Sequence, residues 1–263
     1  MPTVFFVAPF LSPVAARMVE AIGALPGVRL GVLSADRQED APESTRRAIA
    51  QHWRIDDVLD DEQLELGARA LTERLGPPDR IFGAYEQLQV PLAELRERWG
   101  VPGLPAEAAR NFRDKARMKA VLQAAGLPCA RFRLVESAAE ARAAAAAAVG
   151  YPLVVKPPAG AGSVATYRVG DAAGLEEALE ATGPVPGHPV LLEEFLVGDE
   201  HSCETITLDG VPVWHSITHY HPTPLEVMQT PWIQWCVVLP REVDAARYDD
   251  VRATGDAALR ALG

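Results

Sequence analysis

Short apolar runs alternate with helical patterns through the front part of the chain. Three of these runs are rich in β-branched or aromatic residues and predict buried strands at 4–8, 29–33 and 80–84. Apolar residues recur at helical spacing behind Ser12-Pro13, at 64–75 and at 88–99. The polar segment 34–57 is expected to be a loop. Because strands and helices alternate, the pattern predicts an open parallel α/β sheet.

The pattern changes beyond the Gly- and Pro-rich stretch 101–105, which predicts a linker. Asp114 is a good N-cap for a helix that Gly126 ends. Met118, Val121, Leu122 and Ala125 share one face of this helix. Further strands are expected at 130–135, 153–155, 164–169, 190–196 and 237–239, and further helices at 137–148, around 175–179 and after 248. These elements predict a small α+β lobe and the beginning of another lobe.

Composition and charge narrow the function classes. The 263 residues are 48% hydrophobic and 23% charged, which is ordinary for a globular protein. A formal net charge of −11 argues against a nucleic-acid surface, which needs a basic patch. No apolar run approaches the length of a membrane span, and the three cysteines are far apart, as in a protein with reduced thiols. We expect a cytoplasmic protein with no nucleic-acid or membrane partner.

The loop behind one predicted strand has the composition of a phosphate site. Lys156 ends the strand at 153–155, and the loop after it contains Gly160, Gly162 and Ser163. Small residues let backbone N–H groups approach an anion, and the lysine supplies a positive charge. The alternative is a surface lysine before an ordinary turn.

A second lysine stands where a helix disfavours it. Lys115 follows Asp114 in the first helical turn, where a cation opposes the helix dipole. A locally unfavourable charge is typical of functional sites, because consistency between sequence and structure tends to fail there. The alternative is that Lys115 extends into water, at a cost of about a few tenths of a kcal/mol.

Three features follow one another along the chain. They are the Asp114-Lys115 helix start, the strand that ends at Lys156 with its loop, and the sequence Glu-Glu-Phe-Leu-Val-Gly-Asp-Glu at 193–200. Their order and spacing resemble the ATP-grasp enzymes, and most closely the carboxylate–amine ligase branch. The resemblance covers residues 111–219. It implies a front α/β domain at 1–104, an ATP-grasp small α+β lobe at 105–189, and the start of an incomplete second lobe at 190–263.

The resemblance also implies an ATP site that works with Mg²⁺. In such a site Lys115 and Lys156 would hold the triphosphate and stabilise the charge that develops on it. The loop that contains Gly160, Gly162 and Ser163 would close over the phosphates.

For the adenosine part, the resemblance assigns the stretch 193–200. Glu193 would contact the adenine amino group, and Glu194, Phe195 and Leu196 would form the backbone edge beside the ring. Glu200 would accept hydrogen bonds from the ribose hydroxyls, because a carboxylate accepts two of them. Without the upstream lysines, an amphipathic strand with outward glutamates would be the preferred interpretation.

Two residues are candidates for contact with the substrate. The turn at 8–13 contains no glycine, which argues against an NAD or FAD site in the front sheet. Glu86 follows the third strand, where α/β sheets place ligand residues, although a solvated glutamate at a helix start is the alternative. His219 alternates with His221 along a predicted strand, and their spacings match no standard zinc site. Metal binding, substrate or phosphate contact, and ordinary packing stay open for these histidines and for His201 and His215, and no metal ligand is assigned.

The activity that the resemblance implies is ligation of a small-molecule carboxylate to an amine through an acylphosphate. No residue is assigned as a covalent catalyst, because the protein would supply positioning and electrostatics. One alternative is a biotin-carboxylase-type ATP-dependent carboxylase, although the loop after Lys156 has fewer glycines than in those enzymes. Another is a nucleotide-binding module without turnover. A homodimer is left open as the assembly.

The chain departs from the family pattern near its end. The family places its Mg²⁺ ligands on later strands, commonly with a Glu-x-Asn segment, and no such segment follows Leu239. Either this chain is a fragment of a longer protein or the lobe is incomplete by nature. We favour a fragment and expect the Mg²⁺ ligands beyond residue 263. Such a fragment would bind nucleotide weakly and catalyse nothing, because the charge on the transferred phosphate needs a metal.

Overall fold

The computed structural model describes residues 1–159, 165–230 and 232–263 of the chain. The chain forms two compact units, residues 1–113 and 114–263, and each has its own hydrophobic core. Helix α5 (Ala106–Arg113) therefore belongs with the front unit, whereas we expected a boundary at 104/105. The predicted combination of a parallel α/β sheet with antiparallel α+β parts is confirmed.

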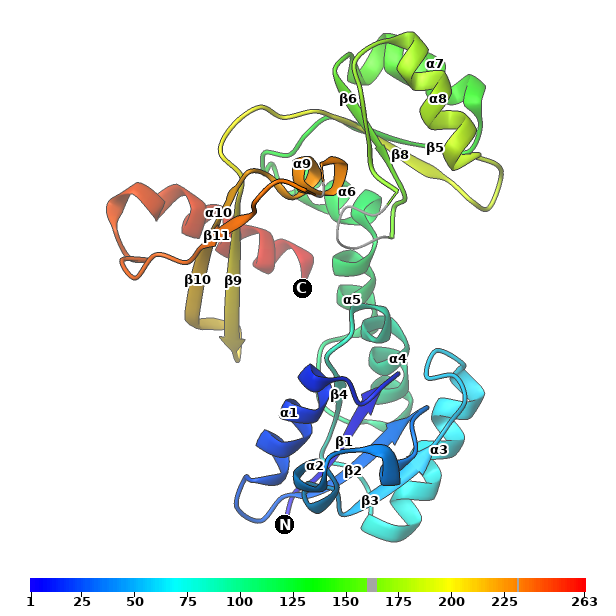
Figure 1. Ribbon diagram of the computed structural model, residues 1–263, viewed down its shortest axis with the longest axis vertical. Helices are drawn as coiled ribbons and strands as arrows, with labels where there is room; N and C mark the ends of the chain where they lie inside the picture. Colours follow the sequence, from blue (N-terminus) through cyan, green and yellow to red (C-terminus); the bar gives the residue numbers. More distant parts are fainter. Residues whose placement is uncertain (160–164, 231) are drawn as a thin grey trace. The chain divides into compact units, whose positions relative to one another are not determined.

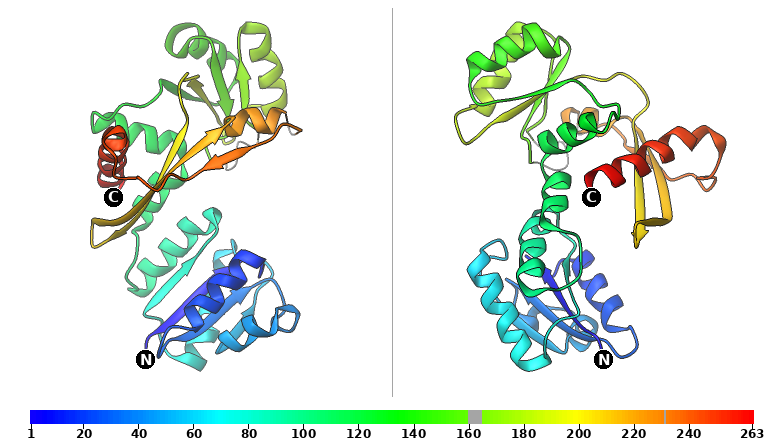
Figure 2. Two further views of the ribbon diagram at one scale, coloured as in Figure 1. Left: turned by 60° about the vertical axis from the view of Figure 1, so that its left-hand side comes forward. Right: turned by 180° about the vertical axis from the view of Figure 1, so that it is seen from behind.

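The front unit is built on a parallel four-stranded sheet in the order β3-β2-β1-β4 (Figures 1 and 2). Its strands are β1 (Thr3–Ala8), β2 (Arg29–Ser34), β3 (Gln51–Arg54) and β4 (Arg80–Gly83). Its other helices are α1 (Pro13–Gly23), α2 (Glu43–Ala48), α3 (Asp61–Leu75) and α4 (Gln89–Trp99), with short 3-10 helices η1 (Gln38–Asp40) and η2 (Glu86–Leu88). The open parallel sheet predicted from the alternation of elements is confirmed.

The side chains of β1 explain why both faces of this sheet are covered. Phe5 and Val7 point into a core shared with α3 and α4, whereas Phe6 and Ala8 point into a core shared with α1. Figure 1 shows α1 and α3 on opposite sides of the sheet. As predicted, α1 starts behind Ser12, whose side chain accepts a hydrogen bond from a backbone N–H of the first turn.

The expected loop at 34–57 is wrong, because the segment contains both α2 and β3. β3 lies at the edge of the sheet and pairs with β2 alone. Its sequence, Gln-His-Trp-Arg, has no apolar alternation, so local patterning could not reveal it. Its position depends on backbone pairing with β2 and on Trp53, which packs against the core.

The second unit begins with α6 (Lys115–Ala124) and a small lobe with an antiparallel sheet. The sheet has the order β5-β8-β6-β7, formed by β5 (Phe132–Val135), β6 (Leu153–Lys156), β7 (Tyr167–Val169) and β8 (Val190–Glu194). One face packs against α7 (Ala138–Ala144), the π-helix η3 (Ala145–Val149) and α8 (Ala172–Thr182) (Figure 2). We expected residue 190 to begin the next lobe, but β8 lies between β5 and β6 in the small-lobe sheet. These pairings join segments that are far apart in the sequence.

A second antiparallel sheet, in the order β11-β10-β9, belongs to the same unit. A long hairpin of β9 (His201–Leu208) and β10 (Val211–His221) forms most of it, and β11 (Cys236–Val238) pairs with β10. The remaining elements are α9 (Pro224–Gln229), η4 (Ala246–Tyr248) and α10 (Asp249–Leu262), the helix predicted after 248. The three cysteines are free thiols. No helix formed by the described residues has the length and apolar character that crossing a membrane requires.

Candidate functional site

Lys156 and Glu193 meet on one face of the small-lobe sheet. β6 and β8 are antiparallel neighbours with Val154 opposite Glu193, so Lys156 and Glu193 lie on the same face. The other face carries Leu153 and Leu192, which point into the core beneath α7 and α8. Lys156 Nζ is 2.8 Å from Glu193 Oε2. The end of β6 therefore delivers the predicted lysine to the predicted adenine-contacting glutamate.

A third charged side chain completes this cluster. Lys119 Nζ, from α6, is 3.2 Å from Glu193 Oε1 and 5.9 Å from the ring centre of Phe132. Phe132 is the register partner of Glu193 on β5, so the ammonium group lies near both. Lys119 is only 8% exposed. We call Lys119, Lys156 and Glu193 the Lys–Glu–Lys cluster.

The apolar face of α6 is not its most buried one. The buried positions are Ala116 and Lys119, whereas Met118, Val121 and Leu122 are half-buried and Ala125 is exposed. A buried lysine looks like a surface residue to any pattern of apolar positions. It is tolerated here because Glu193 compensates its charge.

The start of α6 lies against the segment that follows β6. The backbone N–H of Lys115 donates a hydrogen bond of 3.0 Å to the carbonyl of Pro158. Asp114 caps the helix as predicted, accepting from the N–H groups of Ala116 and Arg117. The two lysine-bearing elements named by the sequence are thus adjacent. The predicted loop residues Gly160, Gly162 and Ser163 lie outside the described residues.

Glu194 points away from the cluster, as expected for its alternate position on β8. Its carboxylate accepts two hydrogen bonds of 3.0 Å from the Arg131 guanidinium. These side-chain bonds, and then the bond from the Arg131 backbone N–H, lower the pKa of Glu194. The N–H groups of Glu194 and Phe195 donate to the carbonyls of Arg131 and Pro152.

Two further features lie just beyond β8. The guanidinium carbon Cζ of Arg168 lies 4.2 Å from the centre of the Phe195 ring, as in a cation–π contact. Leu196 is exposed, and its backbone N–H has no hydrogen-bond partner among the described residues. That group is thus available to a ligand at the end of the strand.

Glu200 is exposed at the rim of a cavity of about 570 Å³ in the second unit. His201, His219 and His221 line the cavity, and His219 Nε2 is 2.7 Å from the hydroxyl of Tyr248. Burial lowers the pKa of His219, and the nearby His201 and His221 lower it further. Within residues 1–159, 165–230 and 232–263, no group of three or more His, Cys, Asp or Glu side chains is arranged to hold a metal ion.

The other substrate candidate, Glu86, lies in the front unit. It starts η2, directly after β4, at the carboxyl edge of the parallel sheet. Its carboxylate is 3.1 Å from Nη1 of Arg113, so it is ion-paired rather than simply solvated. Nearby on the same edge, the hydroxyls of Ser12 and Tyr85 are 2.8 Å apart. The roles of Glu86 and His219 in substrate binding stay predictions.

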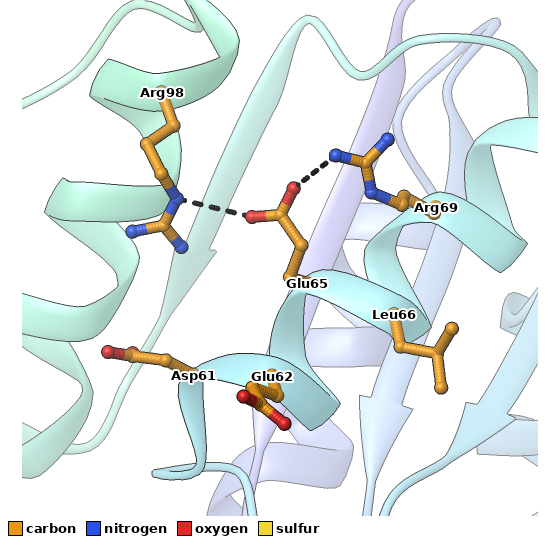
Figure 3. A pocket seen from close by; sticks show the side chains of 6 residues that line it. All are labelled: Asp61, Glu62, Glu65, Leu66, Arg69 and Arg98. Atoms are coloured by element: carbon orange, nitrogen blue, oxygen red, sulfur yellow. Dashed lines mark hydrogen bonds and ion pairs between the residues drawn. The ribbon is translucent and has the colours of Figure 1, made fainter.

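A cavity of about 390 Å³ on the front unit has a structural explanation (Figure 3). Its central residue, Glu65 of α3, pairs with Arg69 at 2.7 Å and with Arg98 of α4 at 3.2 Å. Burial would raise the pKa of Glu65, but hydrogen bonds from Trp99, Arg69 and Arg98 outweigh it and lower that pKa. These contacts tie α3 to α4, and none of the residues that line the cavity was predicted as functional.

Comparisons with known proteins match the part of the chain that contains Lys156 and Glu193. A family model described as D-ala D-ala ligase C-terminus matches residues 121–222. The L-arginine-specific L-amino acid ligase of Bacillus subtilis is 28% identical over 184 residues, which cover 65% of this chain and 44% of the relative. The D-alanine--D-alanine ligase of Delftia acidovorans is 30% identical over 200 residues, which cover 72% of this chain and 58% of the relative. The chain thus spans about half the length of these curated relatives.

Solved structures show the same fold. The L-amino acid ligase from Bacillus licheniformis aligns with a TM-score of 0.74 at 21% identity, over 100% of this chain and 60% of that chain. An N5-carboxyaminoimidazole synthetase from Staphylococcus aureus complexed with ADP aligns with a TM-score of 0.68 at 14% identity, over 99% of this chain and 63% of that chain. Together with the family model and the curated relatives, these matches support the resemblance to the ATP-grasp enzymes and to their carboxylate–amine ligase branch.

Proposed function

We propose that this chain binds ATP in the small lobe of its second unit, and that the protein uses ATP to join a carboxylate to an amine. The observation that carries the proposal is the Lys–Glu–Lys cluster, which sets two ammonium groups and one carboxylate on a single sheet face. The names of the curated relatives, an L-amino acid ligase and a D-alanine--D-alanine ligase, support this type of reaction.

The contacts of the described residues fit a purine nucleotide. Glu193 Oε2 is buried and has no hydrogen-bond partner among them, although Lys156 Nζ is close enough for an ion pair. A buried acceptor of this kind suits an amino group, because leaving it without a donor is costly. The available N–H of Leu196 suits a ring nitrogen, and Glu194 and Phe195 continue the edge beside the ring. Glu200 then accepts from the ribose.

The triphosphate is assigned to Lys156 and Lys115. Lys156 is one-fifth exposed at the end of β6, so its ammonium can turn from Glu193 to a phosphate. Lys115 stands at the start of α6, beside the segment that leaves β6. The helix N-terminus adds a partial positive charge there. The loop residues Gly160, Gly162 and Ser163 are proposed to cover the phosphates.

The proposed reaction has two steps. An oxygen of the substrate carboxylate attacks the γ-phosphorus, the bond to the β-phosphate oxygen breaks, and ADP leaves behind an acylphosphate. The amine nitrogen then attacks the acyl carbon, inorganic phosphate leaves, and the nitrogen loses a proton. Lys115 and Lys156 would contribute by orienting the phosphates and compensating the negative charge. Glu86 and His219 are the candidates for contact with the substrates.

The described part of this chain gives no basis for assigning a ligand to Mg²⁺. Phosphoryl transfer in ATP-grasp enzymes relies on Mg²⁺, but the described residues contain no group of three or more potential ligands. We therefore assign no residue of this chain to Mg²⁺ and no step to the metal.

Calorimetric titration with ATP and Mg²⁺ tests nucleotide binding. We expect a Kd of about 10⁻⁶–10⁻⁵ M, weakened at least tenfold by Lys156→Met because a charge-assisted bond to phosphate is lost. The matched control is Arg133→Met, which removes an exposed cation from the same sheet. Absence of binding by a folded chain, or equal losses in the two variants, would contradict the proposed site.

The reaction is tested by ADP release. A ligase releases ADP only when a carboxylate and an amine are both supplied. ADP release that depends on bicarbonate would favour the carboxylase alternative. Because the Mg²⁺ ligands are expected beyond residue 263, this assay needs a longer protein that carries them. Tight binding by that protein without ADP release under any of these conditions would favour a nucleotide-binding module.

A further inference from the structure

The lysines of this chain are confined to one place. Only three of its 25 lysine and arginine residues are lysines, namely Lys115, Lys119 and Lys156. Two of them belong to α6, the third ends β6, and Lys115 is hydrogen-bonded to the segment after β6. Everywhere else the chain uses arginine. The proposed function employs Lys115 and Lys156, which leaves Lys119 without a role.

Lys119 differs from the other members of the cluster in burial. Its side chain is 10% exposed, compared with 15% for Glu193 and 20% for Lys156. A guanidinium group is larger and planar, whereas an ammonium group is a compact point charge that fits between Glu193 and the Phe132 ring. Lys119 is thus a buried cation whose charge the Glu193 carboxylate compensates.

The two lysines bind different oxygens of Glu193. Lys119 is paired with Oε1 and Lys156 with Oε2. When a triphosphate binds, the more exposed Lys156 can leave Glu193 for the phosphates. The carboxylate then keeps Lys119 as its only ammonium partner, and Oε2 becomes accessible to another donor.

We propose that Lys119 is a positioning residue that stays paired with Glu193 Oε1 when nucleotide binds, and that this pair selects a 6-aminopurine over a 6-oxopurine. The inference rests on the proposed ATP site. An ionised carboxylate can only accept hydrogen bonds, so it accepts from an amino group and repels a carbonyl oxygen. Lys119 holds the carboxylate in this orientation while Lys156 is on the phosphates. Without Lys119 the carboxylate is free to turn away from the 6-position, and the discrimination is lost.

The experiment compares the binding of ATP and ITP to the full chain by calorimetry, because the two nucleotides differ in the 6-position of the purine. We expect the wild-type protein to prefer ATP by about 10- to 100-fold, the range for one mismatched buried hydrogen bond. Lys119→Met should lower this ratio about tenfold or more, whereas Arg117→Met, an exposed change on the same helix, should leave it unchanged.

Repeating the comparison in a protein that carries Glu193→Gln distinguishes a positioning role of Lys119 from a general loss of nucleotide binding. With Glu193→Gln present, adding Lys119→Met should not change the ATP/ITP ratio further, because the carboxylate on which Lys119 acts is gone. A merely structural role would weaken both nucleotides equally. An unchanged ratio in a folded Lys119→Met protein, or the same drop with and without Glu193→Gln, would overturn the inference. If the wild-type protein binds neither nucleotide, the proposed function fails instead.

Acylation of amines, measured by mass spectrometry, tests the same inference on the wild-type protein without any substitution. The chain offers an acylating reagent only three lysine side chains and its N-terminus. ATP should protect Lys115 and Lys156, whereas Lys119 should react slowly both with and without ATP. Fast labelling of Lys119 that ATP suppresses would place this residue on the nucleotide and overturn the inference.

Discussion

Replacing Glu193 by leucine should destabilise the second unit strongly. The change leaves two ammonium groups, formerly 3.2 Å and 2.8 Å from its oxygens, without their counter-ion. Lys156 can turn toward solvent, but the Lys119 side chain is only 10% exposed and has no described acidic partner other than Glu193. Breaking a buried ion pair by removing one partner costs about 3–5 kcal/mol. Because only one of the two lysines stays buried, we expect about 3 kcal/mol.

The assay measures the urea midpoint of unfolding of the second unit. The signal is the hydrogen-exchange protection of the backbone amides of β6 and β8. Because the chain has two compact units, a single unfolding curve would mix two transitions, and a signal restricted to the second unit avoids this. With a slope of about 2 kcal/mol per M of urea, the midpoint should fall by about 1.5 M. Adding Lys119→Met to Glu193→Leu should recover most of the loss. A midpoint within about 0.3 M of the wild-type value, which corresponds to about 0.6 kcal/mol on that slope, would refute the reasoning.

Three further predictions concern other parts of the fold. Gly67→Ala should destabilise the front unit by about 1–3 kcal/mol in urea unfolding, because the added methyl would clash with the buried Leu33 side chain. Gly174→Ala meets only ordinary contacts and should stabilise the second unit by about 0.5–1 kcal/mol. Glu65 has a lowered pKa, so it stabilises the front unit above its unfolded-state pKa and loses this effect as the pH falls through its folded-state pKa; Glu65→Gln should make the acid side of the stability curve shallower. His201→Asn should raise the pKa of His219 in an NMR titration, because it removes one of the groups that lower it; an unchanged or lower value would contradict the assignment.

The front sheet could be predicted from sequence because its information is local. Each inner strand is an apolar run, and each neighbouring helix repeats its apolar residues at the helical period, so the pattern gives both the elements and their order. β3 was not predicted because an edge strand needs only one partner and few apolar residues. The long hairpin of β9 and β10 carried a signal that was not used, namely Asp209-Gly210, whose positive φ angles of 50° and 77° form its turn.

The candidate site was only partly predictable. Lys115, Lys156 and Glu193 stand in recognisable motifs, and the structure brings the last two into contact. Lys119 could not be found from its surroundings in the sequence, because its burial depends on a carboxylate far along the chain. The scarcity of lysine was the available clue, since all three lysines fall within α6 and β6.

The hydrogen bond from the Lys115 N–H to the Pro158 carbonyl joins the two lysine-bearing elements through the main chain. It satisfies one of the helix-start donors that have no partner within the helix. Alanine-scanning mutagenesis would not detect this contact, since alanine at either position keeps the backbone donor and the backbone acceptor. Insertions or deletions after Lys156 would break it without altering any charged group. Variation in loop length, rather than in residue type, is therefore the change to which the spacing of the two elements should be most sensitive.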